Sequence, residues 1–147
     1  MGVLAIYELL FLLLFLVPYV FFLFTLYRIA QQISVQNRKL VPAQVWLLLI
    51  PLFNLIWMFV VINKLAASIR QECDRLNIAY TQQTPTKDIG NVFALMSIAS
   101  LMPIIGLFFG LAAFICWIIY WTQVAAYRKR FIENKDNELL DVEKLSA

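Results

Sequence analysis

The stretch LLLIPLFNLIWMF (residues 47–59) decides how this chain folds, because it is apolar throughout except for one amide side chain. It lies inside residues 43–63, a run of 21 residues without a charged side chain. About 20 predominantly apolar residues suffice to cross a bilayer as a helix. The stretch therefore predicts a membrane-spanning helix over residues 43–64 that carries a proline, Pro51, and an asparagine, Asn54, in its interior.

The composition of the whole chain is typical of a membrane protein. Of its 147 residues, 63% are hydrophobic and 14% are charged, whereas soluble domains average about 45–50% apolar and about 25% charged residues. A chain of this length leaves a large share of its surface exposed, so lipid must cover much of the apolar excess. No Lys or Arg precedes Arg28, and the first apolar run is too long for a signal peptide, so we expect an uncleaved membrane anchor.

Apolar segments on both sides of the opening stretch extend the pattern. The first, residues 4–27, carries a single charge. Residues 89–127 would reach about 58 Å as one helix, against about 30 Å of hydrocarbon. The sequence MPIIG at 102–106 places a proline and a glycine where a hairpin turn is needed, so we expect two helices, over residues 88–103 and 106–127. The alternative is one long kinked helix that leaves the membrane.

The expected architecture is all-α: a polytopic integral membrane protein with four transmembrane helices within residues 1–130 and a charged tail over 131–147. After the second helix, apolar residues recur at three- and four-residue steps, which predicts an amphipathic extension over residues 65–80. The apolar stripe consists of Leu65, Ile69, Cys73, Leu76 and Tyr80. Glu72 and Arg75, three residues apart, are expected to pair on the polar face of this extension.

The distribution of basic residues predicts the orientation. With four spans, nine Lys and Arg residues fall on the side of the two termini, and three, Arg28, Arg38 and Lys39, fall on the other side. Short loops that are rich in Lys and Arg stay on the cytoplasmic side. We therefore expect a multi-pass protein with both termini in the cytoplasm.

Pro51 and Asn54 are unusual inside a spanning helix. A proline there leaves the carbonyl four residues earlier without its backbone donor, and an amide near the bilayer midplane must bond to protein rather than to lipid. We expect Pro51 to bend the second helix and Asn54 to bond across to Ser97 or Ser100 on the third. The alternative is a polar path for transport lined by Asn54, Asn63 and Ser97, as at the broken helices of transporters.

Two further features concern contacts between helices. Glu8 is an acidic residue inside the first predicted span, about one turn from the boundary. We expect it to be hydrated there or to form an ion pair with Lys64 or Arg128, which end other helices on the same side, and the alternative is a proton relay. Gly106 and Gly110 form a G-x-x-x-G motif, whose small residues allow a neighbouring helix to come close.

Residue types that catalysis needs are missing from the sequence. It contains no histidine, which excludes histidine-ligated haem, histidine-bearing zinc sites and histidine-based acid–base catalysis. It has no P-loop, dinucleotide-binding or nucleophile-elbow motif, and no clustered basic face with interleaved aromatic residues for nucleic acid. We therefore expect no catalytic, cofactor or metal site.

The expected role is that of a non-catalytic accessory or scaffold subunit of a membrane complex, or of a homo-oligomer. Its contacts would be the lipid bilayer and either a protein partner or further copies of itself. The alternative is a small oligomeric transporter or channel with a polar path near Asn54.

The order of motifs also resembles a known family. Pro42-x-x-x-Trp46 is followed by Pro51-x-x-Asn54-x-x-Trp57 and then by a charged helix. This pattern is similar to that of small bacterial four-helix integral membrane proteins, grouped as a domain of unknown function, whose second helix carries a Pro-x-x-Asn element. The resemblance covers the first half of the chain. It implies a four-helix architecture in a bacterial inner membrane and no particular chemistry.

Overall fold

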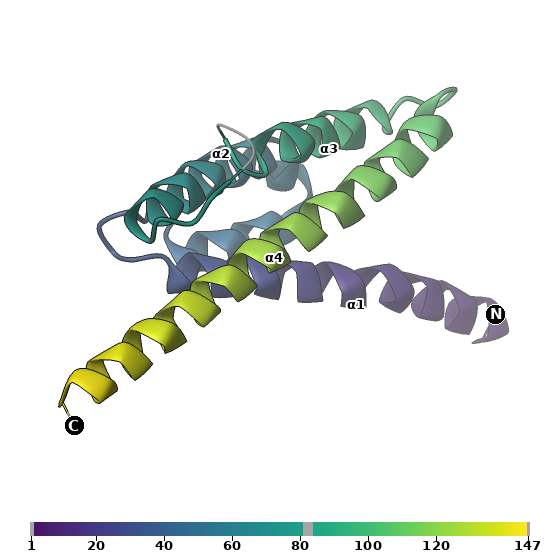
Figure 1. Cartoon of the computed structure of the whole chain (residues 1–147). Coiled ribbons are helices and arrows are strands. Elements are labelled where there is room, and N and C mark those ends of the chain that lie inside the picture. Colours follow the sequence, from purple (N-terminus) through teal and green to yellow (C-terminus); the bar gives the residue numbers. More distant parts are fainter. Residues whose placement is uncertain (1, 81–83, 147) are drawn as a thin grey trace.

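The computed structural model describes residues 2–80 and 84–146, and these residues form helices and no β-strand (Figure 1). In chain order the elements are α1 (Gly2–Gln32), the 3-10 helix η1 (Pro42–Leu49), α2 (Pro51–Arg75), α3 (Lys87–Ala99) and α4 (Gly106–Ser146). The expectation of an all-α protein is therefore confirmed. The last helix, 41 residues long, runs without interruption through the region expected to be a separate charged tail.

Three of these helices, α1, α2 and α4, are long and apolar enough to cross a membrane. With 13 residues, α3 reaches about 20 Å, which is short of the hydrocarbon thickness of about 30 Å. Four spanning helices are therefore not confirmed. The predicted break between the third and fourth helices is present as an open turn over residues 100–105, and α4 begins at Gly106 as expected. The third helix, however, ends at Ala99 and not at residue 103. The 3-10 segment before position 51 was not predicted, so the second helix begins at Pro51 and not at residue 43.

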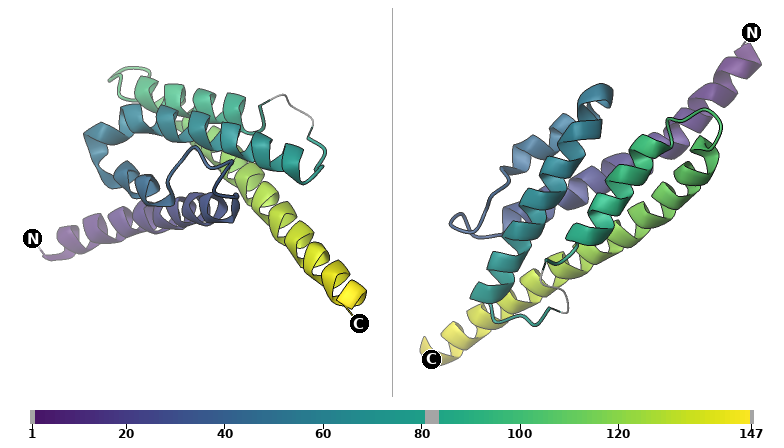
Figure 2. Two further views of the ribbon diagram at one scale, coloured as in Figure 1. Left: turned by 90° about the vertical axis from the view of Figure 1, so that its left-hand side faces the viewer. Right: turned by 90° about the horizontal axis from the view of Figure 1, so that it is seen from above.

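The long helices α1, α2 and α4 run in one direction, and the short elements η1 and α3 return in the opposite one (Figure 2). As a result, the loop after α1, the end of α2 and the C-terminal part of α4 meet. Ser34 Oγ of the loop donates to the Glu72 carboxylate over 2.7 Å, and Lys135 Nζ of α4 donates to the carbonyl of Gln32 over 2.7 Å. This end of the molecule is termed the basic end. It consists of residues 28–41, 64–80, 84–88 and 128–146.

All 12 Lys and Arg residues of the chain belong to the basic end. The sequence predicted that Arg28, Arg38 and Lys39 face the side opposite the tail. Instead, the backbone N–H of Lys39 donates to Ser68 Oγ on α2 over 2.8 Å. That prediction assumed that the chain crosses the membrane completely after residue 39. In the structure, η1 leads away from the basic end and α2 leads back to it (Figure 2). The first turns of α1 and the last turns of α4 accordingly lie at opposite ends of the molecule, not together as expected (Figures 1 and 2).

The core forms where the second half of α1 meets α4. Phe22 of α1 is completely buried. Its ring packs edge-on against Trp117, Tyr120 and Trp121, with ring centroids 5.7, 6.0 and 6.0 Å away. Edge-to-face aromatic pairs contribute about 0.5–1.5 kcal/mol each beyond the area that they bury. This cluster therefore fixes the crossing of the two longest helices.

A second contact region lies where α2, α3 and α4 meet. A Cβ atom on Gly90 of α3 would lie 2.7 Å from Cγ2 of Ile62 and 2.9 Å from Cε2 of Tyr120. The helices approach this closely because position 90 has no side chain. The predicted apolar stripe of the α2 extension faces the same interior, and its members Leu65, Ile69 and Cys73 have no exposed surface.

Pro51 begins α2 and does not bend a continuous helix. Ile50, before it, has an extended conformation with φ −84° and ψ 111°, as expected for a residue that precedes proline. Proline is well suited to the first position of a helix because the N–H that it lacks would be unsatisfied there. The carbonyl of Leu47, expected to lose its donor, accepts the N–H of Ile50 over 3.2 Å. The prediction of a kinked helix is therefore wrong at this position.

Candidate functional site

A cavity of about 650 Å³ lies among the four α-helices, next to Phe22 on the side of the N-terminal half of α1. Ligand pockets in proteins have volumes of about 300–1,000 Å³. The walls are mostly apolar. They are formed by Leu14, Phe15, Pro18, Tyr19, Asn54, Leu55, Met58, Phe93, Ala94, Ser97, Gly110, Ala113, Phe114 and Trp117. This space is termed the four-helix cavity.

Asn54 lies at this cavity but does not bond to the third helix. The Tyr19 hydroxyl of α1 donates to the carbonyl of Leu48 over 3.1 Å and also interacts with the Asn54 side chain. The Oδ1 atom of Asn54 is buried without a hydrogen-bond partner. The predicted bond across to the serines of α3 is absent, and the polar side chain with which Asn54 interacts, Tyr19, belongs to α1.

The hydroxyl groups of the two serines donate hydrogen bonds to backbone carbonyls of α3 itself. Ser97 Oγ donates to the carbonyl of Phe93 over 2.8 Å, and Ser100 Oγ donates to the carbonyl of Ser97 over 2.7 Å. Serine hydroxyls in helices commonly bond to a carbonyl one turn earlier. This local bond competes with the bond to Asn54 that the sequence predicted.

The other residue of the expected polar path, Asn63, lies elsewhere. Its Nδ2 atom donates to the carbonyl of Phe59 over 2.8 Å and to Oδ1 of Asn91 on α3 over 3.2 Å. Nine residues separate it from Asn54, which places the two on opposite sides of α2. Of the predicted path residues, the structure brings Asn54 and Ser97 to one cavity and leaves Asn63 outside it.

The expected ion pair of Glu8 does not form. Glu8 is exposed in the first half of α1, far along the helix from the basic end, to which Lys64 and Arg128 belong. The Lys64 ammonium lies 5.9 Å from the ring centroid of Trp57, and Nε of Arg128 is buried without a hydrogen-bond partner. The prediction was wrong because it placed the start of α1 and these two cations on one side.

Gly106 and Gly110 both lie opposite the end of α3. A Cβ atom on Gly106 would collide with the carbonyl oxygen of Ser100, whereas one on Gly110 would make an ordinary contact, 3.8 Å from Cβ of Ser100. Gly106 is therefore needed for the tight turn into α4. The small-residue motif serves the hairpin within the chain at this position.

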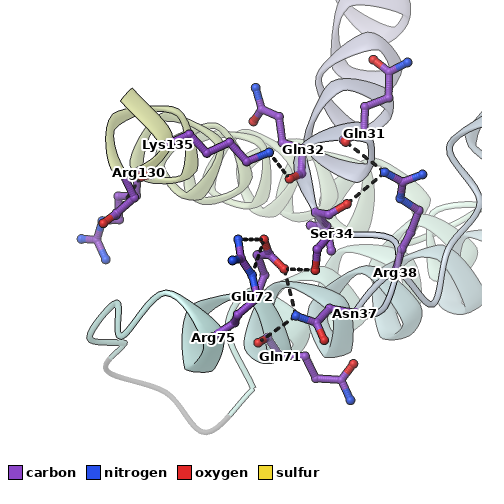
Figure 3. A network of polar contacts seen from close by, with 12 residues as sticks. Gln31, Gln32, Ser34, Asn37, Arg38, Gln71, Glu72, Arg75, Arg130 and Lys135 are labelled. Carbon is purple, nitrogen blue, oxygen red and sulfur yellow. Dashed lines mark hydrogen bonds and ion pairs between the residues drawn. The ribbon is translucent and has the colours of Figure 1, made fainter. Parts of the chain in front are cut away.

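At the basic end, a buried carboxylate joins the loop 33–41 to α2 (Figure 3). Glu72 has no exposed surface. Ser34 Oγ and Asn37 Nδ2 donate to its Oε2 atom over 2.7 and 2.9 Å. Arg75 donates to its Oε1 atom through Nε over 3.2 Å and through a terminal nitrogen over 2.8 Å. Both carboxylate oxygens are thus bonded.

These bonds determine the charge of Glu72, which lies in the charged last turns of α2, beyond its apolar stretch. Burial by itself raises the pKa of this carboxyl group, but the hydrogen bonds from Arg75, Ser34 and Asn37 together outweigh burial and lower the pKa from 4.5 to about 2. The hydrogen bond to Glu72 in turn raises the pKa of Arg75. Glu72 is therefore an anion at neutral pH.

Two cations beside this carboxylate hold the end of α1. Arg38 donates to the carbonyls of Gln31 and Ile33 over 3.0 and 2.9 Å, and Lys135 donates to the carbonyl of Gln32 (Figure 3). The last carbonyls of a helix lack partners within the helix and attract positive charge. The network therefore fastens α1, the loop, α2 and α4 to one another.

The sequence revealed only part of this network. The predicted pair of Glu72 and Arg75 is present, but Glu72 is buried and not on a polar face. The donors Ser34 and Asn37 are 38 and 35 residues away in the chain, and no spacing pattern connects them to α2. Among the residues that the structure describes, no group of three His, Cys, Asp or Glu side chains could hold a metal ion.

No protein-family model, curated protein or solved structure matches this sequence. The resemblance to small bacterial four-helix membrane proteins therefore stays a prediction.

Proposed function

We propose that this chain is a non-catalytic integral membrane protein that acts by association in the bilayer, as a homo-oligomer or as an accessory or scaffold subunit of a membrane complex. The observation that carries the proposal is the incomplete packing of α1. Residues 2–17 are exposed along their whole length, and this half of the helix extends away from the other helices (Figure 2).

The exposed half of α1 and the four-helix cavity are adjacent, because Leu14 and Phe15 line that cavity. One copy thus carries an exposed apolar half-helix beside a cavity whose walls are mostly apolar. Helices in lipid associate through close van der Waals packing and not through a hydrophobic driving force. A second copy supplies a matching apolar helix at the same depth, which supports the homo-oligomer as the first form to test.

Cysteine crosslinking in native membranes tests the proposal. Phe11→Cys places a thiol on the exposed half of α1, where this side chain is 65% exposed, in a Cys116→Ala background. We expect oxidation to give covalent dimers. Val35→Cys at the basic end, 80% exposed, is the matched control and should stay monomeric. A single unlinked copy in both variants and in mild-detergent mass analysis would exclude the homo-oligomer, whereas a defined adduct with another protein would support the accessory role.

We propose further that the basic end faces the cytoplasm, because Lys and Arg residues stay on that side of a membrane. The N-terminal end of α1 then lies on the opposite side, and only the C-terminus is cytoplasmic. The bacterial inner membrane is proposed on the resemblance alone.

Transport is the second candidate function. It is supported by Asn54 and Ser97, which line one cavity, and by the unpartnered oxygen of Asn54. If the chain conducts a solute, Asn54→Leu should abolish flux in proteoliposomes. Flux that is unaffected by this substitution would remove Asn54 from any path.

A further inference from the structure

A second cavity, of about 380 Å³, opens at the basic end. Its walls come from three separate parts of the chain: the loop before η1, one face of α2 and the segment that enters α3. They include Lys39 from the loop, Asn63, Arg70 and Asp74 from α2, and Thr84 and Lys87 from the last segment. This cavity is termed the basic pocket.

The basic pocket has an excess of positive charge. Its one carboxylate, Asp74, accepts the hydroxyl of Tyr80 over 2.7 Å, and that hydroxyl also interacts with Arg70. In the described part of the chain, none of the three cations of the pocket, Lys39, Arg70 and Lys87, has a carboxylate within ion-pair distance. The ion pairs of this end involve other residues, Glu72 with Arg75 and Glu133 with Lys129. Three cations around one cavity repel one another, and a bound anion would relieve that repulsion.

Exposed apolar surface leads away from the basic pocket. At its inner end, Asn63 bonds to Asn91 and so connects α2 to α3. On α2, Ile56 lies two turns before Asn63 on the same face and is 74% exposed. On α3, Leu95 lies one turn after Asn91 and is 56% exposed. A ligand that fits both regions has an anionic head and apolar chains.

We propose that the basic pocket binds the phosphate group of an anionic phospholipid, with Lys39, Arg70 and Lys87 as its ligands and with acyl chains along the faces of Ile56 and Leu95. Guanidinium and ammonium groups are the usual protein ligands of phosphate. Clusters of basic residues at the cytoplasmic boundary of spanning helices bind anionic lipids in this way. The inference rests on the proposed orientation and is independent of the proposed self-association.

The test uses the full chain in mild detergent, titrated separately with phosphatidylglycerol, phosphatidylcholine and inorganic phosphate. Native mass spectrometry reports bound lipid, and thermal unfolding reports the shift of the midpoint. We expect phosphatidylglycerol to be retained and to raise the midpoint. Each of Lys39→Ala, Arg70→Ala and Lys87→Ala should weaken binding about fivefold, and the triple variant on the order of 100-fold.

A variant with the same loss of charge, Arg28→Ala, Lys129→Ala and Lys144→Ala, is the matched control, because none of these residues lines the basic pocket. It should bind phosphatidylglycerol as the parent chain does. Three results would overturn the proposal: equal retention of phosphatidylcholine, an equal midpoint shift with inorganic phosphate alone, or an equal loss of binding in the control variant. The single variants keep the test valid if the triple variant does not fold.

Discussion

Glu72 is a charged residue that is fully buried yet remains ionised. A buried carboxylate is costly unless it is paired and hydrogen-bonded. Here the donors come from Ser34, Asn37 and Arg75, so that both oxygens are occupied. Because two of these donors lie on the loop after α1, the charge of one side chain determines how that loop packs on α2.

Glu72→Gln should therefore destabilise the protein. The amide keeps the size of the side chain but loses its charge and one acceptor, and hydrogen bonds to charged groups contribute about 1.5–3 kcal/mol each. We expect a loss of about 2–3 kcal/mol at pH 7, measured by unfolding in detergent. Glu133→Gln is the control: its pair with Lys129 is exposed and 3.7 Å long, so the change should stay below about 1 kcal/mol.

The lowered pKa of Glu72 also predicts that the stability of the fold depends on pH. Its pKa is lower in the folded chain, about 2, than its ordinary value of 4.5. The unfolded chain therefore takes up the proton first as the pH falls. The stabilisation is complete above about pH 4.5 and is lost between about pH 4.5 and 2. The parent chain should lose stability over this window, and Glu72→Gln should lose less. An equal loss in both would show that another group is responsible.

The two half-buried asparagines of α2 should respond in opposite ways to leucine. Asn54 Oδ1 has no hydrogen-bond partner, and a buried unsatisfied group costs about 1–3 kcal/mol. Asn54→Leu should therefore raise the unfolding free energy by about 1 kcal/mol. Asn63→Leu removes bonds to Phe59 and Asn91 and should lower it by about 1 kcal/mol. Destabilisation by both substitutions would mean that Asn54 is bonded after all.

At the scale of elements, two hairpins form the side of the bundle that faces α1. Each has a short element, η1 or α3, that runs opposite to the long helix after it, and a proline near the reversal (Figure 2). Pro51 is the first residue of α2, and Pro103 lies in the uncharged turn before α4. Backbone groups within hydrocarbon must be satisfied inside the protein. In the second turn, the N–H groups of Leu101 and Met102 donate to carbonyls three residues earlier over 3.1 Å. These two donors of the second turn are therefore satisfied within the chain.

The contact of α3 with α2 and α4 depends on Gly90. A methyl group there would lie 2.7 Å from Ile62 and 2.9 Å from Tyr120, so Gly90→Ala should cost about 1–3 kcal/mol through overpacking. Gly110→Ala is the matched control, with its nearest neighbour at 3.8 Å, and alanine at that helical position should stabilise by up to about 1 kcal/mol. Thermal unfolding of both variants checks the pair. Equal effects would contradict the close packing at position 90.

The sequence predicted the class of the fold and one buried face, because both follow from periodicity. Leu65, Ile69 and Cys73 recur at helical spacing and are buried together. The sequence could not show in the same way that Pro51 begins a helix. An apolar run has the same composition whether it forms one spanning helix or two elements of opposite direction, such as η1 and α2. Contacts of Glu72 and Asn54 were missed for another reason. Their partners, Ser34 and Tyr19, lie on α1 or in the loop that follows it, and only the packing of α1 brings them near.

At the scale of the whole molecule, the charge is strongly polarised. No Lys or Arg occurs in residues 1–27, 43–63 or 88–127, and all 12 lie in the basic end. With four crossings the basic residues were divided nine to three between the two sides. With three parallel long helices and two returning short elements, they all lie at one end of the molecule, as the proposed orientation with a cytoplasmic basic end requires.

Cysteine labelling in vesicles of known orientation distinguishes the two arrangements. In a Cys116→Ala background, Arg38→Cys and Leu140→Cys should both react from the cytoplasmic side, because the loop after α1 and the end of α4 lie together at the basic end. Leu4→Cys, on an exposed position of α1, should be protected from cytoplasmic reagents and react only from the opposite side. Four full crossings would instead place position 38 outside and positions 4 and 140 inside. Because Cys73 has no exposed surface, the background chain should stay unlabelled until it is unfolded.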